Sequence, residues 1–180
     1  MTTWADAQSS SAVHDEARVA IDESVAALER RDAAHFGSAL PASAAWRLYG
    51  DFLEESVFLD IETTGLGGDS YTTMCGVLDR DGFRAFVRGE NLGELPEALE
   101  KYRVVYSFNG LAFDVPFLRR EFGPVLRSAA HVDLMHVMRR LGFRGGLKRV
   151  EHAARVVRLR RQGIFIGRSI EQAERHYRTY

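Results

Sequence analysis

The pattern of apolar and polar positions divides the chain into two regions. In residues 13–31, apolar side chains recur every three or four positions, which is the period of an amphipathic helix. Residues 35–54 form a connector with one proline and several aromatic side chains. From residue 56 on, short apolar runs rich in β-branched and aromatic residues alternate with helical patterns. We therefore expect a helical N-terminal extension over residues 1–34 and one domain over residues 35–180.

Five apolar runs in the domain predict β-strands, at residues 56–62, 71–78, 83–87, 103–108 and 129–133. The sequence DRDG at residues 79–82 joins the second run to the third, as in a hairpin. Helical patterns predict helices at residues 92–102, 113–122, 134–141, 147–156 and 170–180. Strands in hairpin order, followed by strands that alternate with helices, indicate an α/β fold with a mixed sheet flanked by helices.

Composition narrows the class of protein. With 180 residues, 46% of them hydrophobic, the chain is long enough for one sizeable core. Its single cysteine, Cys75, excludes an internal disulfide and lies in an apolar run, which favours a buried structural thiol. No apolar run approaches the length of a membrane span, and the N-terminus lacks a basic segment followed by an apolar one. We expect a cytoplasmic protein without a membrane partner; its oligomeric state stays open.

The net charge of −1 hides a strong asymmetry. Residues 1–114 carry 9 Lys or Arg against 20 Asp or Glu, whereas residues 115–180 carry 15 against 5. Only two of the 24 basic residues are lysine, and arginine is well suited to bidentate phosphate contacts. The basic region is therefore compatible with a polyanionic partner such as nucleic acid. The alternative is that its helices display charge for solubility.

Two carboxylates lie at the end of the first predicted strand, in the sequence FLDIETTGL at residues 58–66. Residues i and i+2 of a strand share a face, so Asp60 and Glu62 should lie roughly 6.6 Å apart at about 3.3 Å rise per residue. Paired carboxylate oxygens suit Mg²⁺ or Mn²⁺. The alternative interpretation is a solvated strand end without chemistry.

A second acid follows the fourth predicted strand, in the sequence YSFNGLAFDVPFL at residues 106–118. Asp114 begins a helix there, where it could also serve only as an N-terminal cap, and Asn109 could be only a turn residue. Ligand sites favour the carboxyl edge of such sheets, so Asp114 should converge with Asp60 and Glu62. Converging carboxylates that hold two metal ions are the usual apparatus of phosphodiester hydrolysis.

These two motifs together resemble the first two motifs of the DEDD 3′–5′ exonucleases, which have the ribonuclease H-like fold. The stretch at residues 131–151 resembles the YprB-type branch of that group, and the resemblance covers about residues 35–180. It implies a metal-dependent nuclease that acts on single-stranded DNA or RNA and uses Mg²⁺ or Mn²⁺. The implied metal ligands are Asp60, Glu62 and Asp114. The implied substrate contacts are Thr63, Asn109 and Phe113.

The third motif of these exonucleases, a Tyr or His followed by an aspartate, has no counterpart, because no aspartate follows Asp133. We therefore expect a C-terminally truncated domain without the fourth carboxylate. The candidate substitutes are Asp133 and Glu151, although Glu151 could instead support the ligands or lie on the surface. His176 or Tyr177 is a candidate general base. For Asp133 the alternative is a helix cap near the site. Two functions stay open: a 3′–5′ exonuclease, or a non-catalytic ribonuclease H-like module that binds nucleic acid.

Overall fold

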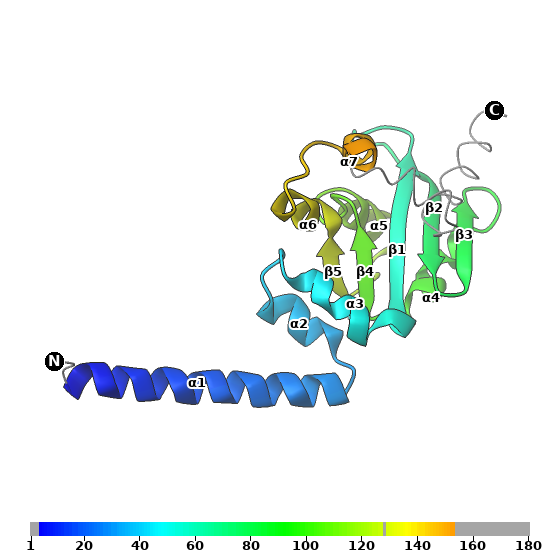
Figure 1. Cartoon of the computed structure of the whole chain (residues 1–180). Helices are drawn as coiled ribbons and strands as arrows, with labels where there is room; N and C mark the ends of the chain where they lie inside the picture. The colour runs from blue at the N-terminus through cyan, green and yellow to red at the C-terminus, as the bar shows by residue number, and fades with distance from the viewer. Residues whose placement is uncertain (1–3, 128, 154–180) are drawn as a thin grey trace.

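The computed structural model of the chain describes residues 4–127 and 129–153. Its centre is one five-stranded sheet with the strand order β3-β2-β1-β4-β5 (Figure 1). The strands are β1 (Ser56–Thr63), β2 (Thr72–Asp79), β3 (Gly82–Val87), β4 (Val104–Ser107) and β5 (Ala130–Asp133). β1, β2 and β3 pair antiparallel, whereas β1–β4 and β4–β5 pair parallel. The predicted mixed sheet is confirmed.

Helices precede, interrupt and follow the strands. They are α1 (Trp4–Glu29), α2 (Ala33–Ala39), α3 (Leu48–Asp51), α4 (Leu95–Leu99), α5 (Asp114–Phe122), α6 (Leu134–Arg140) and α7 (Leu147–Ala153). Short 3₁₀ turns lie at η1 (Ala45–Arg47), η2 (Leu53–Glu55) and η3 (Leu92–Glu94). Among the described residues, no helix is both long and apolar enough to span a membrane. The helix predicted for residues 170–180 lies outside the described residues.

Alternation along the strands builds a core on each face of the sheet. On one face, Val57, Leu59 and Ile61 of β1 pack with α4 and α5. On the other face, Tyr106 of β4 and Val132 of β5 pack with α2 and α3. This two-sided burial is typical of parallel strands whose connecting helices cover both faces. Cys75 is buried in the first core, as predicted, and burial raises the pKa of its thiol.

Two segments differ from the prediction. The connector at residues 35–54 holds α3 and most of α2, because Phe36, Leu48 and Phe52 are buried against the sheet. The helix predicted over residues 92–102 is a 3₁₀ turn followed by the five-residue α4. Beyond that helix, the Tyr102 hydroxyl donates to Asp79 at 2.5 Å.

The N-terminal helix α1 extends away from the sheet (Figure 1). It begins at Trp4, earlier than the periodicity of residues 13–31 predicts, and it ends at Glu29. Ala27 is fully buried where α1 meets α2, whereas Val13 and Ile21 are about 60% exposed. α1 therefore joins the domain only through its last turns. The division into residues 1–34 and 35–180 stays a prediction.

Candidate functional site

The end of β1 presents two carboxylates on one face, as predicted. Leu59 and Ile61 are buried in the core, while Asp60 and Glu62 between and after them are exposed. The register with β2 shifts between Glu62 and Thr63, which marks a bulge at the strand end. The Thr63 hydroxyl donates to the Gly65 carbonyl at 2.9 Å and so turns the chain away from the sheet.

Asp114 joins the start of α5 to this strand end. Its side chain is only 3% exposed, and Oδ1 accepts a hydrogen bond of 3.0 Å from the backbone amide of Ile61. Ile61 lies between Asp60 and Glu62, so this bond fixes the third carboxylate beside the first two. The Asp114 carboxylate is thus attached to the backbone of β1 at the residue that separates Asp60 from Glu62.

The electrostatics of this edge are unfavourable for the carboxylates alone. Burial, and then the negative charges of Glu62 and Glu151, raise the pKa of Asp60 to about 6 even though its side chain reaches solvent. Burial, and then the charge of Asp60, raise the pKa of Asp114 to about 7. In the described part of the chain, no Lys or Arg forms an ion pair with Asp60, Glu62 or Asp114. A cation would relieve this repulsion.

The donor set fits a hard divalent cation in its chemistry, because all three candidate ligands offer carboxylate oxygens. The positions of these side chains do not yet form a metal site. Among residues 4–127 and 129–153, no three His, Cys, Asp or Glu side chains converge closely enough to hold a metal ion as they stand. Asp60 and Glu62 are exposed, so binding would need their side chains to turn toward Asp114.

Asp133 organises the neighbouring strand end. It is 3% exposed, and its Oδ1 accepts from the Met135 amide at 2.9 Å, which makes it the N-cap of α6. The same oxygen accepts from the Asn109 amide at 2.8 Å. Asn109 has a φ of +63°, a left-handed conformation that asparagine tolerates better than most residues. Asp133 thus shapes the turn after β4, which leads to Asp114.

The sequence did not reveal the role of Gly110. A Cβ at this position would come within 2.1 Å of the Ser107 Oγ and 3.0 Å of the Asp114 Oδ2. Only glycine fits between the end of β4 and the third carboxylate. The sequence signal for Gly110 was the Asn-Gly pair itself, which we interpreted only as a turn.

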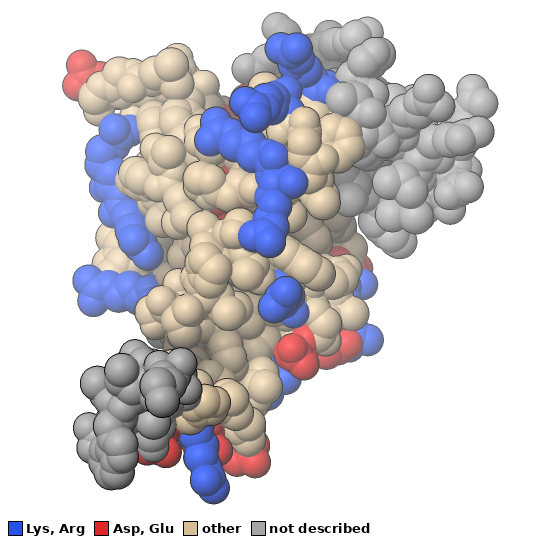
Figure 2. All heavy atoms as spheres, turned by 60° about the vertical axis from the view of Figure 1, so that its left-hand side comes forward, with Lys and Arg blue, Asp and Glu red and all other residues tan. Residues whose placement is uncertain are grey.

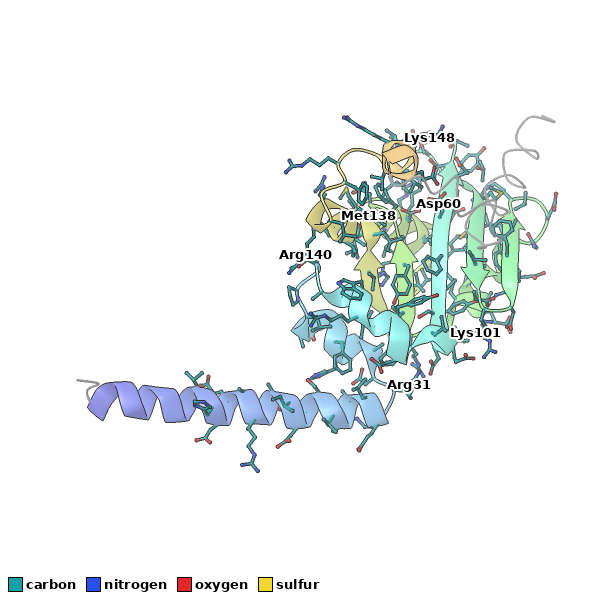
Figure 3. The ribbon with its side chains drawn as sticks, viewed as in Figure 1. Arg31, Asp60, Lys101, Met138, Arg140 and Lys148 are labelled. Atoms are coloured by element: carbon teal, nitrogen blue, oxygen red, sulfur yellow. The ribbon has the colours of Figure 1, made fainter. Side chains whose placement is uncertain are left out.

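The remaining candidate residues differ in how well the structure supports them. Phe113 is half-buried, with its ring 4.9 Å from that of Phe117, and packs against the core next to Asp114. Glu151 is half-buried on α7, and its charge reaches Asp60. Figure 3 shows Asp60 at the upper end of β1, with Lys148 of α7 above it in this view. His176 and Tyr177 lie outside the described residues.

Substitution of Asp133 separates a structural cap from a metal ligand. Asp133→Ala should lower the free energy of unfolding by about 2–4 kcal/mol, because two partly buried amides lose their acceptor. Asp133→Asn keeps an acceptor oxygen, so it should cost less than half as much in urea denaturation. If Asn and Ala prove equally destabilising, the capping role is wrong. If Asp133→Asn weakens Mn²⁺ binding in a titration as much as a change at Asp114 does, Asp133 is a ligand.

One family model and two solved structures are similar to this chain. The sequence matches the family model of the RNase H superfamily over residues 57–178. The structure is similar to the family B DNA polymerase of the hyperthermophilic archaeon Pyrobaculum calidifontis, with 17% identity and a TM-score of 0.37, over 49% of this chain and 18% of the polymerase. It is also similar to the Nibbler EXO domain of Aedes aegypti, with 13% identity and a TM-score of 0.40, over 54% of this chain and 51% of that one. No curated protein matches the sequence.

Proposed function

The chain belongs to the RNase H superfamily, and from this membership and its carboxylate cluster we propose that it hydrolyses phosphodiester bonds with Mg²⁺ or Mn²⁺. The resemblance of its two motifs to those of DEDD enzymes favours 3′–5′ exonuclease action on single-stranded DNA or RNA. The observation that supports the proposal is the hydrogen bond from the Ile61 amide to the buried Asp114 carboxylate, because Ile61 separates Asp60 from Glu62 in β1.

Each acid has a part in this proposal. Asp60, Glu62 and Asp114 would hold the ions, which when bound activate a water and stabilise the leaving oxygen. Asp114 is already fixed by β1, so it provides the rigid side of the site, while the exposed Asp60 and Glu62 provide the adjustable side. Because the pKa values of Asp60 and Asp114 are about 6 and about 7, both acids must release protons before they serve as ligands.

A second function is supported by a separate observation. In the part of the chain that the structure describes, no three potential ligands converge on a metal position. A non-catalytic ribonuclease H-like module that binds nucleic acid would need no such convergence. This module would bind single strands in a salt-dependent way and leave them intact.

Digestion of end-labelled oligonucleotides decides between the two. With a 5′ label and Mn²⁺ or Mg²⁺, single-stranded DNA or RNA should shorten progressively from the 3′ end, and EDTA should stop the reaction. A substrate with a blocked 3′ end is the control for exonuclease polarity, because it should resist. If the oligonucleotide is bound equally well with and without EDTA but is never shortened, the result supports the non-catalytic module instead.

A further inference from the structure

Five exposed cations follow one another along α6, α7 and the segment between them. We call this set the basic track; its members are Arg139, Arg140, Arg144, Lys148 and Arg149. In the described part of the chain none of them forms an ion pair, although other cations, among them Arg31, Arg88 and Lys101, each pair with an acid. Figure 2 shows Lys and Arg side chains gathered on the side of the molecule where α6 and α7 lie. Positive charge gathered in this way attracts anions such as phosphate groups.

The basic track lies at the same edge of the sheet as the carboxylates. α6 begins directly after Asp133, whose carboxylate holds the turn that leads to Asp114. In Figure 3, Lys148 on α7 lies above Asp60, and Arg140 lies farther to the left and lower, at the end of α6. Lys101 and Arg31 are at the other end of the sheet. The basic track therefore runs from the end of α6 to α7, which lies above the proposed catalytic site in this view.

Two contacts hold members of the track in place. Arg149 packs against Gly145, where an added Cβ would come within 2.7 Å of its Cδ. Arg140 donates to the Ser43 hydroxyl at 3.1 Å, which links α6 to the segment before η1. Neither contact neutralises charge. The guanidinium groups thus remain available to phosphate oxygens while losing part of their freedom.

An exposed aromatic side chain lies on the same face of the sheet as Asp60. Tyr49 is 45% exposed, and its ring is 6.3 Å from that of Phe58 and 5.8 Å from that of Tyr106. Phe58 precedes Asp60 by two residues and shares its face of β1. Cations that follow a backbone, together with an aromatic ring on which a base can stack, are the usual elements of single-strand binding.

We propose that the basic track binds the phosphodiester backbone of a single-stranded nucleic acid and directs its end toward Asp60, Glu62 and Asp114. This inference rests on the proposed nuclease function and names the surface that holds its substrate. A duplex offers its bases to each other, so it could not use the ring of Tyr49 in this way. The basic track and Tyr49 would therefore prefer single strands to duplexes. They would accept both DNA and RNA, because both have the phosphodiester backbone that the track recognises.

The test is binding of fluorescent oligothymidylate and oligouridylate to the full chain in EDTA, where no hydrolysis occurs. Arg144→Glu together with Lys148→Glu should weaken the affinity at low salt at least tenfold. The slope of log K against log[salt] should fall by about 1–2, since each phosphate contact on a single strand contributes about 0.7. Anisotropy titrations over a range of salt concentrations give both quantities, and circular dichroism verifies that the variant folds.

The matched control changes the same number of charges at the opposite edge. Arg103 and Arg127 are exposed, precede β4 and β5, and line a separate pocket with Pro96 and Phe122. Their double replacement by Glu should change the affinity less than threefold. Equal loss in both double variants would overturn the proposal, as would tighter binding of a duplex than of the single strand. Binding is measured in EDTA and so does not depend on cleavage. If the protein binds single strands through the basic track but never hydrolyses them, only the proposed nuclease function is refuted.

Discussion

Asp114→Asn should lower metal-dependent hydrolysis about a thousandfold. Asparagine has the same shape and can still accept the hydrogen bond from the Ile61 amide, so the turn and the strand end should keep their positions. What is lost is one negative charge in the ligand set, and several kcal/mol of charge stabilisation correspond to such a factor. The measurement is the initial rate of oligonucleotide shortening in Mn²⁺. Asp81→Asn, in the exposed β2–β3 turn, is the matched control and should retain full activity.

The same substitution should stabilise the protein when no metal is present. The pKa of Asp114 is about 7 in the folded chain against an ordinary 3.8, so the folded state binds a proton more tightly than the unfolded state does. Stability from this proton is complete below pH 4 and is lost as the pH rises through 7. In EDTA, the Tm of Asp114→Asn should exceed that of the wild type by a few degrees at pH 8, and the difference should shrink toward pH 5. If the Tm values of the two proteins differ by the same amount at every pH, the pKa of Asp114 is not raised in the folded state.

Gly110→Ala should destabilise the domain by about 3 kcal/mol or more. The added methyl group would overlap Ser107, whose Oγ and Cβ lie 2.1 and 2.5 Å from its position, and both residues belong to the backbone segment that leads out of β4. Overpacking of this kind typically costs 1–3 kcal/mol, and contacts this short place the change at the upper end of that range. The methyl group would also press on Asp114, so activity should fall together with stability.

Urea denaturation provides the comparison for Gly110→Ala. Gly93→Ala is the control, because nothing lies within 4 Å of a Cβ there. The control should stay within about 0.5 kcal/mol of the wild type, as surface substitutions usually do. If Gly110→Ala matched the control, the close approach between β4, the turn and Asp114 would be wrong.

The parts of the site that depend on local pattern could be predicted from the sequence. Alternation in β1 alone places Asp60 and Glu62 on one face, because the side-chain period of a strand is two. The turn sequence at residues 79–82 predicts the β2–β3 hairpin, and apolar runs predict all five strands within a residue or two of their ends. These features need only the nearest neighbours in the chain.

The parts that depend on contacts between distant segments could not be predicted. α2 and α3 are short, and they form because Phe36 and Leu48 find a buried place against the sheet. Asp133 could be a ligand or a cap until the Asn109 amide, 24 residues earlier in the chain, was seen to donate to it. Likewise, no local pattern in the sequence brings the charge of Glu151 to Asp60; the position of α7 near the upper end of β1 does.

The central claim is that Asp60, Glu62 and Asp114 form a site for divalent ions, and calorimetric titration of Mn²⁺ tests it most directly. At pH 7.5, the wild-type chain should bind about two ions, as expected for a two-metal site, with release of protons from its carboxyl groups. Asp114→Asn should lose at least one of these ions. If the wild type binds no more Mn²⁺ than the Asp114→Asn variant, the account of this site as the metal centre of a nuclease is contradicted.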